Sequence, residues 1–105
     1  MANITKEQAD AIWVQHFGDV KWAKDRAGAW ICRENYGITR ELGYGWEIDH
    51  KVPVAKGGTD SFCNLRPLQW ENNRSKSDNY PEWSSQVTSE NDHNIYRKQT
   101  WSFGK

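Results

Sequence analysis

The sequence predicts a small α+β domain, and three observations lead to this class. The 105 residues suffice for one hydrophobic core, so we treat residues 1–105 as a single domain. A pattern of helical period near the N-terminus is followed by short runs of strand period. Aliphatic residues are few, but 7 Trp, 4 Tyr, 3 Phe and a formal net charge of +0 argue against a disordered chain.

The first expected element is a helix over residues 6–17. Thr5 and Gln8 have the spacing of a capping box, in which each side chain satisfies a backbone N–H of the first turn. Apolar side chains then recur at helical spacing up to Phe17, and Gly18 ends the pattern.

Residues 28–33 predict a strand, after a linker that contains Trp22. Residues 35–45 contain three glycines and predict a turn-rich excursion.

The next run, residues 46–50, alternates apolar and acidic side chains with a period of two. In a strand this period places Trp46 and Ile48 on one face and Glu47 and Asp49 on the other.

A loop, a second short strand and a helix are expected to follow. Gly57 and Gly58 fall in the loop. Residues 64–68 predict an edge strand, because Pro67 has no N–H for central pairing. Residues 70–77 contain no helix breaker and predict a short helix.

The remaining segment, residues 81–105, is polar with isolated aromatic residues, and we expect a partly ordered tail that wraps the domain. We expect Trp30, Trp46 and Trp70 to pack against the first helix and form a Trp-rich core.

Asp49 and His50 are the first residues that suggest chemistry. Alone the pair carries little information, since neighbouring strand residues point to opposite faces. They are followed in order by a Gly-Gly loop, Asn64, Asn73 and Lys76. As one ordered set this pattern resembles the HNH (ββα-metal) endonuclease family.

The resemblance centres on residues 46–78 and implies a metal-dependent endonuclease that acts on DNA. By this resemblance Asp49 and Asn73 bind one divalent metal ion, Mg²⁺ or Mn²⁺, with Zn²⁺ or Ni²⁺ as alternatives. An imidazole beside the metal can take the proton of the attacking water, so His50 is the candidate general base.

The resemblance gives three further residues a role. Asn64 corresponds to the family's middle Asn and would stiffen the loop that orients His50. Lys76 and Arg74 would contact the substrate phosphate.

Many members of the family also carry two C-x-x-C pairs that bind a structural zinc. Here Gln69 and Asn72 stand where the downstream pair would fall. Cys32 and Cys63 are the two cysteines of the chain and lie far apart. We therefore expect no structural zinc.

Charge is balanced along the whole chain, which argues against a module that binds nucleic acid by charge alone. A partner protein or a second copy of the chain would be one way to hold a polyanion. No stretch is apolar enough to span a bilayer, and the N-terminus lacks the apolar run of a secretory signal, so we expect no membrane partner and a cytoplasmic protein. The resemblance implies a phage or bacterial setting.

Two other functions stay open at this point. One is a catalytically weak or inactive HNH-like subunit that binds nucleic acid or protein. The other is a metal-free, Trp-rich interaction module.

Overall fold

The computed structural model describes residues 4–102 and combines helices with antiparallel strand pairs, as the α+β class requires. The helices are α1 (Lys6–Phe17) and α2 (Trp70–Lys76). The strands are β1 (Trp22–Lys24), β2 (Trp30–Cys32), β3 (Trp46–His50), β4 (Leu65–Gln69), β5 (Glu82–Glu90) and β6 (His93–Ser102).

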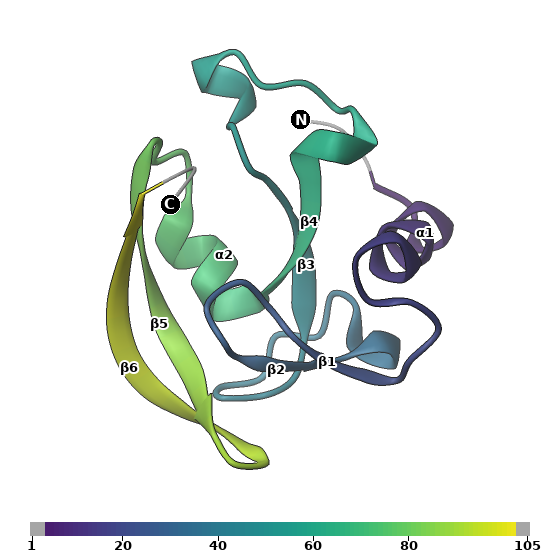
Figure 1. Cartoon of the computed structure of the whole chain (residues 1–105), viewed down its shortest axis with the longest axis vertical. Coiled ribbons are helices and arrows are strands. Elements are labelled where there is room, and N and C mark those ends of the chain that lie inside the picture. The colour runs from purple at the N-terminus through teal and green to yellow at the C-terminus, as the bar shows by residue number, and fades with distance from the viewer. Residues whose placement is uncertain (1–3, 103–105) are drawn as a thin grey trace.

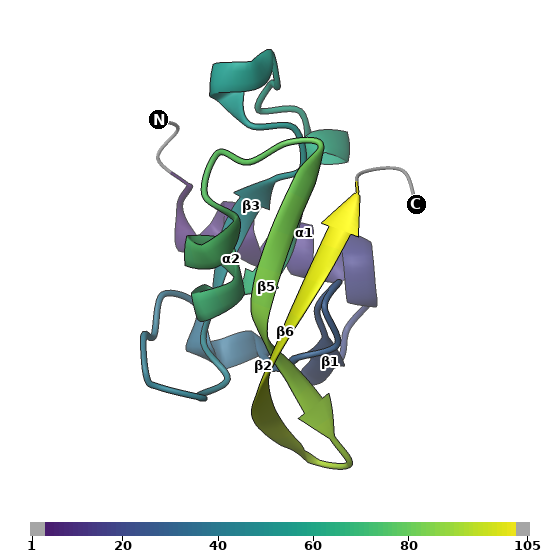
Figure 2. The ribbon, with the colours of Figure 1, turned by 90° about the vertical axis from the view of Figure 1, so that its left-hand side faces the viewer.

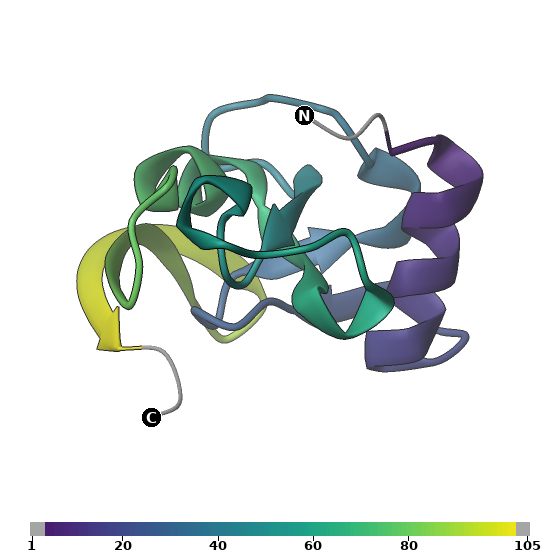
Figure 3. The same cartoon turned by 90° about the horizontal axis from the view of Figure 1, so that it is seen from above.

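Among the described residues the strands form separate antiparallel pairs, β1 with β2, β3 with β4 and β5 with β6. The β3–β4 pair lies in the middle of the molecule, with α1 on one side and α2 on the other (Figure 1). The β5–β6 hairpin covers the outer side of α2, and Figures 2 and 3 show the same order from two further directions. Between residues 4 and 102 no helix is both long and apolar enough to cross a membrane.

The bounds predicted for α1 are confirmed. Thr5 accepts a hydrogen bond from the Gln8 backbone, and the Gln8 side chain accepts one from the Thr5 backbone, so the capping box is complete. At the other end the N–H of Gly18 donates to the Val14 carbonyl.

The core lies between α1 and the inner face of β3. It is formed by Ala9, Trp13, Ile31 and Trp46, all of which are at most 1% exposed. The rings of Trp13 and Trp46 have centroids 5.1 Å apart. Trp46 therefore joins α1 to the central strands.

Trp30 and Trp70 do not join this cluster, so the prediction that they pack against α1 is wrong. The Trp30 indole donates to the Asn91 carbonyl on the β5–β6 side, and the Trp70 indole donates to the Arg40 carbonyl. Both rings carry an N–H that needs an acceptor when it is covered, and these acceptors lie away from α1.

The unit of β3, β4 and α2 follows the predicted order. The predicted strand over residues 46–50 and the predicted helix are confirmed, while β4 begins one residue later than expected, at Leu65. Pro67 lies opposite Ile48, and a two-stranded sheet leaves each strand one edge where the missing N–H is tolerated.

The prediction of a partly ordered tail is wrong for the described part, because residues 82–102 form the β5–β6 hairpin. Residues 103–105 of that prediction lie outside the described residues. Trp83, Ser85 and Val87 are buried at alternating positions of β5. A serine in the middle of this face hides the alternation, and the register also shifts between Ser85 and Val87.

The expected linker around Trp22 contains β1, which pairs with β2. Three residues are too short for a periodic pattern, so only the contact with β2 reveals this strand.

Candidate functional site

A cleft of about 750 Å³ lies beside β3 and α2. Its polar wall is formed by Glu47, Asp49 and His50 from β3 and by Asn73 and Arg74 from α2. The alternation of β3 places Glu47 and Asp49 toward α2 and Trp46 toward Trp13 of α1. Alternation does not account for His50, which is the last residue of β3 and lines the cleft there. The predicted metal, base and helix residues therefore meet in one place.

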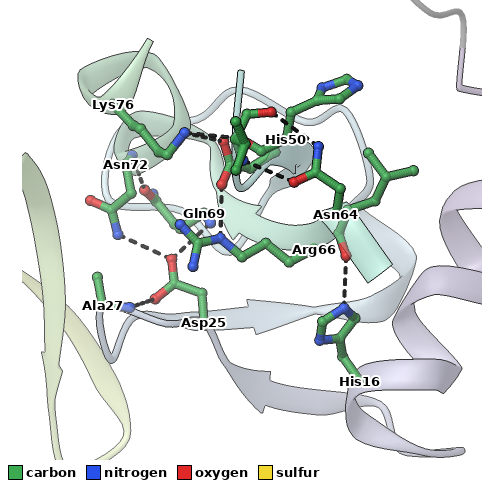
Figure 4. A network of polar contacts seen from close by, with 12 residues as sticks. His16, Asp25, Ala27, His50, Asn64, Arg66, Gln69, Asn72 and Lys76 are labelled. Atoms are coloured by element: carbon green, nitrogen blue, oxygen red, sulfur yellow. Dashed lines mark hydrogen bonds and ion pairs between the residues drawn. The ribbon is translucent and has the colours of Figure 1, made fainter. Parts of the chain in front are cut away.

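Asp49 is 4% exposed and holds an ion pair with each of its two oxygens. The Nε of Arg66, its cross-strand neighbour, lies 2.8 Å from Oδ2, and the Nζ of Lys76 lies 3.1 Å from Oδ1. Figure 4 shows the two cations, Arg66 and Lys76, with the dashed lines of their polar contacts. Arg66 was not among the residues singled out from the sequence, and its place opposite Asp49 depends on the strand register.

Lys76 is 1% exposed and donates a second hydrogen bond to the His50 carbonyl, at 2.9 Å. The structure thus corrects the expected phosphate contact, because a buried, ion-paired ammonium group is not open to a substrate. Lys76 instead fixes the position of Asp49 and of the adjoining backbone.

His50 is paired with a carboxylate that sequence reasoning missed. Its Nε2 lies 2.7 Å from Oδ1 of Asp60, in the loop between β3 and β4. Asp60 is the single acidic residue between residues 51 and 64, which is the signal that could have indicated it.

Asn64 ties this loop together. Its Oδ1 accepts from the Val52 N–H, and its Nδ2 donates to the carbonyls of Val52 and Thr59 at 3.0 and 2.8 Å. A Cβ at Gly58 would lie 1.7 Å from the Val52 oxygen, so only glycine fits this turn of the loop. The loop that carries Asp60 is therefore held by the Asn64 side chain and by a close backbone approach.

Asn73 is turned toward Glu47 rather than Asp49. Its Nδ2 donates to Oε1 of Glu47 at 2.9 Å, and Arg74 donates to the same carboxylate at 2.8 Å. The Glu47 carboxylate raises the pKa of Arg74. The Arg74 side chain is 60% exposed at the edge of the cleft.

Residues 31–79 match the family model described as HNH endonuclease. This segment is an HNH domain. It extends from β2 to just beyond α2 and includes every residue of the cleft's polar wall, which supports nuclease-type activity at the level of the family. No curated protein and no solved structure matches the chain.

Two buried positions of the HNH domain, Gln69 and Asn72, converge on Asp25 (Figure 4). One oxygen of Asp25 accepts from the N–H groups of Ala27 and Ala29, and the other accepts from the Gln69 N–H and the Asn72 side chain. Burial raises the pKa of Asp25, and these hydrogen bonds oppose that shift by favouring the charged form. We call Asp25, Gln69 and Asn72 the Asp25 cluster.

The rest of the Asp25 cluster stabilises α2 and β5. The Gln69 side chain accepts from the first free N–H groups of α2. Asn72 accepts from the N–H groups of Gln86 and Val87 and donates to the Val87 carbonyl, at the point where the β5–β6 register shifts. Its amide thus satisfies backbone groups that the bulge leaves unpaired.

The donor types in the cleft fit a hard divalent cation. Glu47 and Asp49 offer carboxylate oxygens and Asn73 an amide oxygen, the ligands that Mg²⁺ and Mn²⁺ prefer. A carboxylate oxygen that accepts one hydrogen bond keeps a further lone pair. Within residues 4–102 no three His, Cys, Asp or Glu side chains are grouped as a metal site, so an amide or water would have to complete the set.

Proposed function

We propose that the HNH domain hydrolyses phosphodiester bonds in DNA with the help of one divalent metal ion. The observation that carries this proposal is that Asp49, His50 and Asn73, three members of the family's ordered motif, line one cleft. Phosphodiester hydrolysis requires an activated water, neutralised charge on the phosphate and help for the departing oxygen. The cleft contains residue types suited to each of these tasks.

His50 is the proposed general base. The Asp60 carboxylate, 2.7 Å from Nε2, would keep a proton on that nitrogen and leave Nδ1 as the acceptor. In the proposed step the water oxygen bonds to phosphorus while its proton passes to Nδ1. The bond from phosphorus to the leaving oxygen then breaks, and that oxygen takes a proton from solvent.

Asp49 and Asn73 are the proposed metal ligands. A bound cation would neutralise charge on the phosphate and on the departing oxygen. Lys76 and Arg66 hold the Asp49 carboxylate in a fixed orientation. The hydrogen bond from the Asn73 Nδ2 to Glu47 leaves the amide oxygen as the end that can coordinate.

Arg74 is the proposed phosphate contact. Its guanidinium lies 5.5 Å from the centroid of the Trp70 ring, which limits its orientation while leaving it exposed at the cleft edge. Asn64 acts through the loop and is a proposed positioning residue for His50.

One observation favours a second candidate, an HNH-like subunit that binds DNA without cutting it. Two cations already pair with Asp49, and their charge opposes the approach of a metal ion. In this alternative the Asp49 ion pairs are structural and the cleft serves only for binding.

Plasmid cleavage tests the proposal. Supercoiled plasmid DNA is incubated with the protein and Mg²⁺, Mn²⁺, Zn²⁺ or Ni²⁺ in turn, with an EDTA control. We expect cleavage with at least one metal, none with EDTA, and loss of both cleavage and metal binding in Asp49→Ala. Asp92→Ala, at a residue whose side chain is 98% exposed, is the matched control.

Two results would contradict the proposal. DNA binding without cleavage under every metal would favour the binding subunit. The absence of metal binding in a titration would favour the metal-free interaction module.

A further inference from the structure

A second cavity, of about 480 Å³, lies where α1, the β1–β2 turn, β4 and the β5–β6 hairpin meet. This volume is in the range of small-ligand sites. Basic and aromatic side chains line it, and we call it the basic pocket: Lys24, Arg26, Lys51, Arg66, Trp83 and Trp101. The basic pocket and the cleft are different cavities. Arg66 lines the pocket and pairs with Asp49, which lines the cleft.

The charge of the basic pocket differs from that of the whole chain, whose formal net charge is +0. Four basic side chains line the pocket, and Asp25 is the one carboxylate among the described residues that line it. Both oxygens of Asp25 are already occupied by N–H donors of the protein. Arg66 is also paired with Asp49, which does not line the pocket. Basic side chains therefore outnumber acidic ones in the lining, which favours an anion.

The two arginines are held by the paired tryptophans. Arg66 lies 5.2 Å from the centroid of the Trp83 ring, and Arg26 lies 4.6 Å from that of Trp101. The two rings stack on each other with centroids 5.8 Å apart. A guanidinium that lies over a ring directs its N–H groups sideways, so these contacts orient the donors before a ligand arrives.

Arg66 also has a donor that lacks a partner. Its Nε is used by Asp49, whereas its Nη2 is buried without a hydrogen-bond partner. A buried donor left unpaired costs free energy, and an acceptor oxygen beside Arg66 would remove that cost.

His16 of α1 also lines the pocket, and the neighbouring cations affect its pKa. Partial burial lowers the pKa of His16, and the nearby cations of Lys51 and Arg66 lower it further, against a hydrogen bond to the Leu65 carbonyl. Lys51, just after β3, and Arg66, near the start of β4, therefore both act on His16 in the lining of the pocket.

We propose that the basic pocket binds a phosphate group. Several cations from different elements, with fixed guanidinium planes, suit a compact tetrahedral anion that accepts many hydrogen bonds. The phosphate belongs either to a nucleic-acid strand or to free inorganic phosphate. The nucleic-acid source rests on the proposed function, whereas the existence of the site does not.

Titration with inorganic phosphate tests the site directly. The probe is added to isotope-labelled protein in EDTA, and the indole N–H signals of Trp83 and Trp101 are followed by NMR. We expect saturable shifts whose dissociation constant rises about tenfold in Lys51→Gln and in Arg26→Gln. Lys98→Gln, at an exposed lysine outside the pocket, is the matched control and should bind as the wild type does.

The proposal is overturned if the indole signals do not move, or if both pocket variants bind phosphate as tightly as the control. Thermal melts check that each variant is folded. Because Lys51 and Arg26 are tested separately, one of them still decides the matter if the other variant fails to fold.

A competing single-stranded oligonucleotide then identifies the source. Displacement of phosphate by the oligonucleotide, with a salt dependence that falls in Lys51→Gln, assigns the site to a nucleic-acid backbone. No displacement assigns it to free phosphate.

Because the phosphate titration is done in EDTA, its result does not depend on metal-dependent cleavage. If the protein binds phosphate but does not cleave plasmid, the proposed nuclease function is contradicted and the proposed phosphate site is supported. If the protein cleaves plasmid but does not bind phosphate, only the proposed phosphate site is contradicted.

Discussion

Asn72 and Asn73 are neighbours on α2 and belong to two very different polar environments. Asn72 is completely buried in the Asp25 cluster, where its donors and acceptors all meet protein groups. Asn73 is partly exposed in the cleft, and its side chain donates a hydrogen bond to Glu47 while the amide oxygen stays available. A fully satisfied buried network stabilises a fold, whereas a polar group with unused capacity can bind a ligand.

The comparison also assigns different tasks to two buried carboxylates. Asp25 accepts only from neutral N–H donors and joins the β1–β2 turn to the start of α2. Asp49 is paired with Arg66 and Lys76 at the edge of the cleft. The first arrangement predicts effects on stability, and the second predicts effects on activity.

The largest expected effect is on stability, in Asp25→Asn. The new NH₂ group would face N–H donors, so two buried donors lose their acceptor. We expect a loss of about 2–4 kcal/mol in the free energy of unfolding, measured by urea denaturation. Asp92→Asn, on the surface, is the control. Equal midpoints for the two variants would mean that the cluster is not a structural centre.

The next effect is on catalysis, in His50→Ala. A general base contributes about 10²-fold or more, so plasmid cleavage should fall by at least that factor while the fold and metal binding are retained. The ion pair of His93 with Asp92 lies at the hairpin turn, and His93→Ala serves as the control. Wild-type cleavage by His50→Ala would show that the base lies elsewhere.

A third experiment separates the two asparagines. Asn73→Ala should weaken metal affinity with little change in stability, because it removes a proposed ligand. Asn72→Ala should lower the unfolding free energy by about 1–3 kcal/mol, because buried N–H groups of β5 lose their acceptor. Calorimetric metal titration of the folded protein and denaturation give the two values. The reverse pattern would indicate that Asn72, and not Asn73, is the metal ligand.

The smallest effect is expected from metal removal on the fold. EDTA should abolish cleavage and leave the circular dichroism spectrum unchanged, because hydrogen bonds of the Asp25 cluster join the β1–β2 turn, α2 and β5 without a metal ion. Alkylation of Cys63, which is exposed, should be tolerated. Unfolding in EDTA would indicate a metal site built from Cys32, Cys63 or the histidines.

The sequence by itself determined the elements whose cause is local. The capping box predicts α1, the period of two predicts β3, and the motif from Asp49 to Lys76 predicts the HNH domain. Asn64 was expected to act through loop contacts, and its hydrogen bonds are of that kind, although its catalytic role stays a prediction. In each case the determining residues lie within a few positions of each other or at fixed spacings.

Only the tertiary structure decided the features that depend on distant segments. The register shift of β5 leaves backbone groups of Gln86 and Val87 to be bonded by a side chain, and only the packing of α2 brings Asn72 to them. Lys76 is buried because Asp49 lies beside it, and Asp25 is buried because four N–H groups from two segments donate to it. A buried polar side chain is stable only with its partner, and the sequence does not give the partner until the chain has folded.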